Sequence, residues 1–157
     1  MNLFTRWFGS EPALSQASIR DARAMASLHG QSFHRGWSNG EFESLLADRQ
    51  VVAHRALAGR TLTGFVLSRM AADEAEILSV AVAPARRGRG LARSLLDLHM
   101  RRLAGLGIRT IFLEVDQDNL PARRLYSRAG FRQVGQRDAY YRSGPDASTA
   151  LVLRRDL

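Results

Sequence analysis

An apolar strand that ends at a proline and leads into a glycine-rich basic turn constrains this chain more than any other segment. Residues 79–92 read SVAVAPARRGRGLA, and an amphipathic helix is expected from Leu91 to about Leu103. The first turn of a helix has unpaired backbone N–H groups and the positive end of the helix dipole, so it binds anions readily. Gly88 and Gly90 lack side chains, which lets the backbone approach a bulky phosphate. The segment predicts a pyrophosphate-binding turn or a basic strand-to-helix connection without a ligand.

Two common phosphate-binding motifs do not fit this turn. A Walker loop ends in Gly-Lys-Ser or Gly-Lys-Thr, and the chain contains no lysine. A dinucleotide-binding fingerprint has three glycines in the pattern G-x-G-x-x-G, and the third is missing here. Arg86, Arg87 and Arg89 nevertheless add positive charge to the turn. This charge favours an anionic ligand.

The composition is that of one globular domain. The chain has 157 residues, of which 45% are hydrophobic and 24% charged, enough to bury a core. No apolar run approaches the roughly 20 residues of a membrane span, and residues 1–10 lack the apolar region of a signal peptide. The absence of cysteine excludes disulfides, thiolate metal sites and a cysteine nucleophile. We expect a cytoplasmic protein with a single domain over residues 13–157, after an extension over residues 1–12.

The extension carries an apolar face of its own. Leu3, Phe4, Trp7 and Phe8 would share one side of a short helix. Such a face could lie on a membrane surface or dock on a partner protein. We favour instead that the segment folds back on its own domain or forms a partly ordered extension.

The net charge of +8 favours an anionic partner, and all 23 basic side chains are arginine. Nucleic acid is one candidate partner. The arginines are spread over the chain, however, and no aromatic–basic RNA-binding box is present, so no specific nucleic-acid site is expected. No metal site is expected either, since the histidines lack ligand spacing. These are His29, His34, His54 and His99.

Strands and helices alternate along the chain, as expected for a mixed α/β sheet with helices on both faces. Asp21 and Ser38 are expected to cap the first two helices, and Glu41 would complete a capping box with Ser38. A Gly59-Arg60 turn predicts a hairpin. We expect strands at residues 14–20, 50–58, 61–69, 74–82, 109–115, 131–136 and 149–154, and helices at 21–33, from 38, at 91–103 and at 119–129.

A second group of residues, 113–131, can carry acid–base chemistry. Glu114 lies in a predicted strand, and Tyr126 lies on the next helix, where we expect it to be exposed. Acid–base catalysis needs one group that accepts a proton and another that donates one. Glu114 and Tyr126 have the right chemistry for these two tasks. Asp116 and Asp118 lie close to the same strand end and compete with Glu114 for the role of base.

Both segments resemble the GCN5-related N-acetyltransferases (GNAT). The spacing Arg87-x-x-Gly90-x-Ala92 is similar to the acetyl-CoA signature of that family, Gln/Arg-x-x-Gly-x-Gly/Ala. The second segment resembles one branch, the bacterial ribosomal-protein alanine N-acetyltransferases. That branch has Leu-Glu-Val, Asn, Leu-Tyr and Gly-Phe in order, with a Tyr-Tyr pair downstream. Here they are found at residues 113–115, 119, 125–126, 130–131 and 140–141.

The resemblance implies a GNAT fold, in which a mixed, mostly antiparallel sheet has a splayed strand pair that holds acetyl-CoA. It also implies direct acetyl transfer in a ternary complex to a primary amine, most specifically the N-terminal α-amino group of a ribosomal protein. Glu114 is then the proton acceptor and Tyr126 the proton donor. The implied cofactor contacts are Val80, Ala81, Val82, Arg87, Gly88, Arg89, Gly90, Leu91, Ala92, Arg93 and Asn119.

The acceptor is the most open part of this hypothesis. Residues 33–38, Phe-His-Arg-Gly-Trp-Ser, resemble an acceptor-side Phe-Pro-Trp-Ser stretch of the family but lack its proline. Together with Tyr140 and Tyr141 they could form a slot for a small first side chain. The alternatives are a small-molecule amine or a lysine as acceptor, a sensor that binds acetyl-CoA without catalysis, and a module that docks on RNA.

Overall fold

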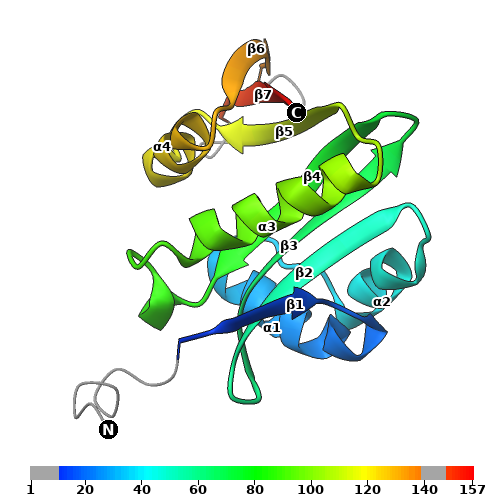
Figure 1. The fold of residues 1–157 in the computed structure, drawn as a ribbon. Helices are drawn as coiled ribbons and strands as arrows, with labels where there is room; N and C mark the ends of the chain where they lie inside the picture. The colour runs from blue at the N-terminus through cyan, green and yellow to red at the C-terminus, as the bar shows by residue number, and fades with distance from the viewer. Residues whose placement is uncertain (1–10, 139–147) are drawn as a thin grey trace, which may run out of the picture.

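The computed structural model describes residues 11–138 and 148–157, which form a seven-stranded sheet with the order β1-β2-β3-β4-β5-β7-β6 (Figure 1). Every neighbouring pair is antiparallel except β4 and β5, which are parallel. The strands are β1 (Ala13–Gln16), β2 (Val51–Ala58), β3 (Thr61–Ala71), β4 (Glu74–Val82), β5 (Thr110–Asp116), β6 (Arg132–Arg137) and β7 (Ala150–Asp156). The helices are α1 (Ala22–Ser32), α2 (Asn39–Ala47), α3 (Leu91–Gly105) and α4 (Leu120–Arg128), with 3-10 turns η2 (Ile19–Asp21) and η3 (Pro84–Arg86).

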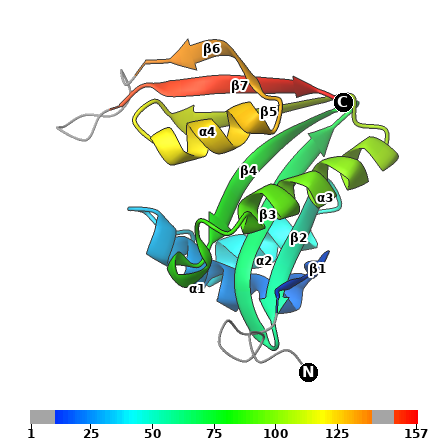
Figure 2. The same ribbon diagram turned by 60° about the vertical axis from the view of Figure 1, so that its left-hand side comes forward.

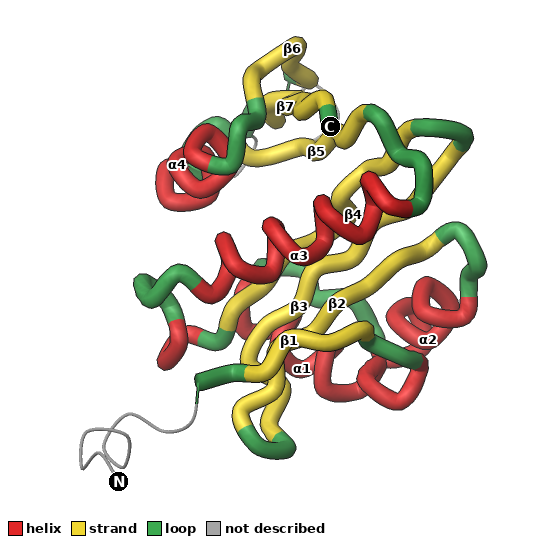
Figure 3. Tube along the Cα trace, viewed as in Figure 1, coloured by secondary structure: helices red, strands yellow, loops and turns green. Residues whose placement is uncertain are grey.

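The helices cover both faces of the sheet (Figures 1 and 3). Strand β3 shows why, because successive side chains of a strand point to opposite faces. Phe65 and Leu67 join a core with Met25 of α1 and Phe42 of α2. Val66, between them, joins a second core that includes residues of α3 and α4. The mixed α/β architecture predicted from the sequence is confirmed.

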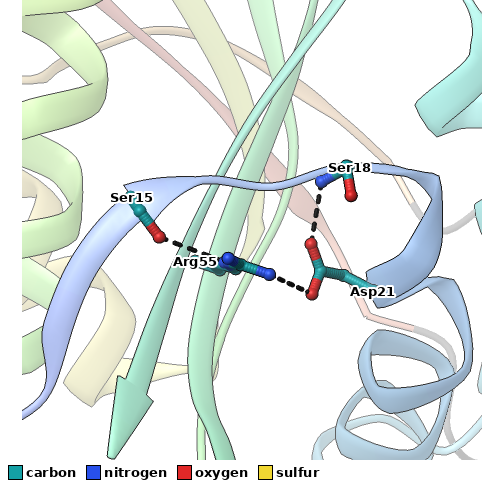
Figure 4. Close-up of polar contacts among 4 residues, drawn as sticks. All are labelled: Ser15, Ser18, Asp21 and Arg55. Carbon is teal, nitrogen blue, oxygen red and sulfur yellow. Dashed lines mark hydrogen bonds and ion pairs between the residues drawn. The ribbon is translucent and has the colours of Figure 1, made fainter. Parts of the chain in front are cut away.

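Most predicted elements end within two residues of the observed ones, and the exception is the first strand. It ends at Gln16 instead of Arg20, and η2 follows. Figure 4 shows the reason. Asp21 Oδ2 accepts the Ser18 N–H at 2.8 Å and Oδ1 accepts from Arg55 Nη1 at 2.6 Å, which turns the chain away from the sheet. Arg55 Nε also donates to Ser15 Oγ at 3.1 Å.

The two predicted helix caps have different outcomes. Asp21 precedes α1, but its carboxylate does not bond the first turn of that helix because Ser18 and Arg55 occupy it. The prediction of a side-chain cap there is wrong. The capping box of α2 is confirmed. Glu41 N–H donates to Ser38 Oγ at 3.1 Å, and Ser38 N–H donates to Glu41 Oε2 at 2.6 Å.

Strands β4 and β5 separate after a short paired stretch, as the predicted splayed pair requires. Residues 74–77 of β4 pair with residues 110–113 of β5, and beyond them each strand pairs only on its other side. Figure 2 shows the two strands fanning apart toward the side on which α4 lies. A β-bulge explains the divergence. Leu67 is opposite Ser79 and Ser68 is opposite Ile77, so Leu78 is an extra residue that bends β4 away from β5.

Some predictions fall on residues 1–10 and 139–147, outside the described residues. These are the apolar face formed by Leu3, Phe4, Trp7 and Phe8, and the pair Tyr140 and Tyr141. Within residues 11–138 and 148–157, no helix combines the length and the hydrophobicity needed to cross a bilayer.

Candidate active site

The glycine-rich turn connects the end of β4 to α3 and presents open backbone. Gly88 has φ +75° and Gly90 has φ +79°, a region that favours glycine. A Cβ atom at either position would meet no heavy atom within 4 Å. Gly90 is the N-cap of α3, and no side chain caps this helix end. The first-turn N–H groups of α3 therefore have no capping side chain, which suits an anion such as a pyrophosphate.

A cavity of about 560 Å³ adjoins this turn. One wall comes from the end of β4 and the start of α3, and the other comes from α4. The first wall consists of Val80, Ala81, Val82, Arg86, Arg87, Gly88, Gly90, Leu91, Ala92 and Arg93. The second consists of Pro121, Ala122, Arg124, Leu125, Tyr126 and Arg128. The structure thus brings the predicted cofactor residues together, apart from Arg89 and Asn119.

Arg89 and Asn119 lie outside the cavity lining. Arg89 lines a neighbouring hollow together with Glu11 and Ser94. Asn119 is the N-cap of α4, and its Oδ1 accepts the Ala122 N–H at 3.2 Å. The capping bond uses the acceptor oxygen of the amide, so the role of Asn119 visible in the structure is to start the helix.

Two arginines of the cavity wall are held by groups of the protein itself. Arg87 Nε donates to the Val82 carbonyl at 3.1 Å, and its Nη2 donates to Ser32 Oγ at 3.3 Å. Arg93 Nη1 donates to the Arg128 carbonyl at 2.8 Å, and its Nε donates to Asp97. Arg87 thereby joins the turn to the end of α1, and Arg93 joins α3 to the end of α4. These contacts fix the positions of both guanidinium groups at the cavity.

Tyr126 lines the cavity but is only 9% exposed, so the prediction of an exposed tyrosine is wrong. It belongs to the same core as Leu113 of β5 and packs edge-on against Phe131, with ring centroids 5.8 Å apart. Burial disfavours the phenolate and raises the pKa of Tyr126 to about 12. The phenol therefore stays protonated at neutral pH and is able to donate a proton.

Glu114 lies on the other face of β5. Its neighbours Leu113 and Val115 are buried in the core with Tyr126, and alternation along the strand directs the carboxylate away from that core. Leu113 is the last residue of β5 that pairs with β4, so Glu114 lies where the two strands separate. Its Oε1 is 3.1 Å from Arg137 Nη2. Tyr126 and Glu114 therefore flank β5 near the divergence, and the cavity lining includes only Tyr126.

The competing carboxylates lie at the end of the same strand. Asp116 Oδ1 accepts the Asp118 N–H at 2.8 Å, which forms the turn that leads into α4. Asp116 shares the face of Glu114, two residues further along β5. Asp118 is exposed in the turn and outside the strand. Of these three carboxylates, Glu114 is the nearest along the chain to the point where β4 and β5 part.

The sequence of residues 22–131 matches the model of the acetyltransferase (GNAT) family. The chain belongs to this family. N-alpha-acetyltransferase RimI of Mycobacterium tuberculosis is 37% identical over 155 residues, which cover 94% of both chains. The chain is accordingly an N-acetyltransferase.

Solved structures of the same fold include one from a bacterium and one from a plant. The ribosomal-protein-S18-alanine N-acetyltransferase from Escherichia coli superposes with a TM-score of 0.85 at 24% identity, covering 92% of this chain and 93% of the other. Arabidopsis thaliana NAA60 in complex with acetyl-CoA superposes with a TM-score of 0.81 at 20% identity, covering 93% and 98%. The GNAT fold expected from the resemblance is confirmed.

This GNAT protein also contains a buried polar group that the sequence did not predict. His54 of β2 and His99 of α3 meet with their Nδ1 atoms 2.8 Å apart, and Ser68 Oγ of β3 lies 2.6 Å from His99 Nε2. The signal was present in α3, because His99 follows Leu95 and precedes Leu103 at helical spacing on the buried face. None of the three lines the cavity. In the described part of the chain, no three His, Asp or Glu side chains gather as metal ligands.

Proposed function

We propose that this enzyme transfers the acetyl group of acetyl-CoA to the α-amino group of a protein N-terminus, with an N-terminal alanine of a small-subunit ribosomal protein as the most specific acceptor. The observation that carries the transfer chemistry is the cavity itself. It joins the uncapped first turn of α3 to the buried phenol of Tyr126. A ribosomal acceptor implies that the enzyme works in the cytoplasm.

The residues of the turn fit the pyrophosphate of acetyl-CoA. Gly88 and Gly90 leave open space where side chains would stand, and Arg87 and Arg93 supply positive charge. The first-turn N–H groups of α3, from Leu91 to Arg93, would bond the phosphate oxygens. The backbone of Val80, Ala81 and Val82 would bond the pantetheine amides and polarise the thioester carbonyl. Arg89 and Asn119 would contact only the parts of the cofactor that extend beyond the cavity.

Glu114 and Tyr126 divide the proton transfers of the reaction. Glu114 accepts the ammonium proton, directly or through water, and the neutral amine then attacks the thioester carbonyl carbon. As the C–S bond breaks, Tyr126 donates its phenolic proton to the departing sulfur. Its pKa of about 12 keeps the phenol protonated until that moment. The second amine proton, which the nitrogen loses as the amide forms, restores the phenol, directly or through water. The acetyl group passes directly to the amine, without a covalent acetyl-enzyme.

An α-amine suits this site better than a lysine side chain. Its pKa is about 7.7–8.0, against about 10.4 for lysine, so more of it is neutral at pH 7. A single exposed carboxylate is a sufficient base for such an amine. The net charge of +8 works against a basic acceptor, and Glu114 and Asp116 on the acceptor-facing side of β5 offset that charge locally. The names of the M. tuberculosis and E. coli proteins support the same class of acceptor.

Two peptides test this proposal in a thiol-release assay with acetyl-CoA. One has a free N-terminal alanine and no lysine, and the other has a blocked N-terminus and one lysine. We expect acetylation of the first peptide only, with the position of the acetyl group established by mass spectrometry. Acetylation restricted to the lysine peptide would show that the α-amine assignment is wrong. If a small amine supports thiol release and neither peptide does, the acceptor is a small molecule.

A further inference from the structure

Arg137 reaches Glu114 across an intervening strand. Glu114 is opposite Val152 of β7, and Val152 is opposite Gly135 of β6. Two residues along each strand, on the same face of the sheet, Asp116 is opposite Ala150, and Ala150 is opposite Arg137. Two strand spacings separate β6 from β5, about 9.5 Å. The arginine can bridge this distance because Ala150, its partner on β7, carries only a methyl group. Arg137 Nη2 lies 3.1 Å from Glu114 Oε1.

The ion pair between Arg137 and Glu114 contributes little to the stability of the fold. The Arg137 side chain is 67% exposed and that of Glu114 is 36% exposed. Solvent-exposed pairs of this kind add little to the free energy of unfolding. The pair also lies at the strand divergence, beyond the last residue at which β5 bonds β4. Its position therefore indicates a role in the reaction more than in folding.

The other charged groups on this face are placed differently. Arg154 of β7 lies over the Phe112 ring, 5.6 Å from its centroid, and its Nε donates to Asp156 at 2.9 Å. Arg132 of β6 is 3.8 Å from the same carboxylate. Two further acidic residues lie on the same face of the sheet as Glu114. Asp116 follows Glu114 on β5, and Glu76 of β4 is opposite Phe112. Within the described residues, Arg137 is the cation paired with Glu114.

We propose that Arg137 is a positioning residue for the acceptor amine, an inference that rests on the proposed role of Glu114 as its base. Arg137 holds the Glu114 carboxylate on the acceptor side of β5. Its positive charge also stands beside the place where the amine must lie to reach that carboxylate. A nearby like charge disfavours the ammonium form, so the guanidinium favours the neutral, nucleophilic amine.

The proton balance of this step is simple. The ammonium N–H bond breaks, and the proton passes to a Glu114 carboxylate oxygen and from there to water, because the carboxylate is partly exposed. The guanidinium keeps its own protons throughout, since arginine is not deprotonated in proteins. Arg137 thus affects the ionisation of the amine without exchanging a proton with it.

The test is the pH dependence of kcat, because kcat reports ionisations in the complex with bound substrates. Four full-length proteins are compared with saturating acetyl-CoA and the N-terminal alanine peptide: the parent, Arg137→Gln, Arg137→Lys and Arg132→Gln. In Arg137→Gln we expect the acid limb of the kcat profile to move to higher pH by about 0.5–1 unit, a small shift because the pair is exposed. Arg137→Lys keeps the charge and should keep most of the parental profile.

Arg132→Gln is the matched control, since this residue lies on the same strand and face but pairs with Asp156. It should leave the profile unchanged, and all variants should retain the parental KM for acetyl-CoA and melting temperature. An unshifted acid limb in Arg137→Gln would overturn the proposal, as would an equal shift in Arg137→Lys. Failure of the parent enzyme to acetylate the alanine peptide would refute the proposed function instead, and this is seen before any variant is made.

Discussion

His29 of α1 accepts the backbone N–H of Trp37 through its Nδ1 atom, at a distance of 3.1 Å. The imidazole also stacks with the rings of Phe33 and Trp37, whose centroids are 4.3 and 4.5 Å away. Burial lowers the pKa of His29, and the nearby Glu41 partly opposes this effect. The neutral imidazole therefore fixes residues 33–38, the stretch that the sequence suggested for the acceptor side.

A His29→Phe substitution should weaken acceptor binding. The phenyl ring preserves the stacking, but the Trp37 N–H loses its acceptor, which costs about 1–3 kcal/mol when such a group stays buried. We expect a severalfold higher KM for the alanine peptide and little change in KM for acetyl-CoA. His34→Phe is the control, because His34 lies in the same stretch and is exposed. Equal KM values for the peptide in the two variants would contradict the prediction.

The buried pair of His54 and His99 should make the enzyme less stable in acid. Burial lowers the pKa of both histidines, that of His99 from 6.5 to about 3. The positive charge of Arg102 adds to the effect on His54. Between pH 6.5 and about 3, the unfolded chain binds more protons at these histidines than the folded chain does. Their contribution to the free energy of unfolding is therefore full above the unfolded pKa of 6.5 and is lost as the pH falls toward about 3.

Urea unfolding at a series of pH values measures this dependence. A variant with His99→Leu and Ser68→Ala removes the buried imidazole together with its hydroxyl partner. Its free energy of unfolding should fall less steeply between pH 6.5 and about 3 than that of the parent. His34→Gln changes an exposed histidine and should keep the parental slope. Identical slopes in the parent and the double variant would remove His99 as the cause.

Gly90→Val should abolish the thermal stabilisation of the protein by acetyl-CoA. A ligand that binds the folded state raises the melting temperature, and a valine side chain at Gly90 would project into open space beside the cavity. Gly59→Val is a matched control, because Gly59 also has positive φ, +62°, but lies in the β2–β3 turn. Both variants carry backbone strain, so both should melt lower, and only Gly90→Val should lose the shift. Parental CoA binding by Gly90→Val would contradict the assignment of the turn.

Tyr126→Phe should reduce kcat and spare cofactor binding. Loss of a general acid typically lowers turnover by roughly 10²–10⁴-fold. The ring, its packing on Phe131 and the wall of the cavity remain, so the acetyl-CoA-induced melting shift should persist. Turnover and melting curves on the same preparation separate the two effects. A fully active Tyr126→Phe enzyme would assign the proton transfer to another group, such as water.

Local sequence signals predicted the glycine-rich turn between strand and helix and most of the secondary structure. Pro84, the two glycines of the turn and the Ser38–Glu41 capping box act over a few residues, so their spacing determines the conformation. The contacts that escaped prediction join distant strands and helices. His99 meets His54 and Ser68 from separate elements. Arg137 reaches Glu114 across β7, a strand that comes later in the sequence than both residues. The burial of Tyr126 has the same origin, since it depends on α4 packing against β5.

The extra residue at Leu78 gives the sheet two edges in its interior, one on β4 and one on β5. An exposed strand edge normally invites pairing with other chains and so promotes aggregation. Here the end of β4 and the start of α3 form one wall of the cavity of about 560 Å³, and α4 forms the other. The bend in β4 thus leaves residues 80–82, which have no strand partner on the β5 side, to line a cavity whose other wall is α4.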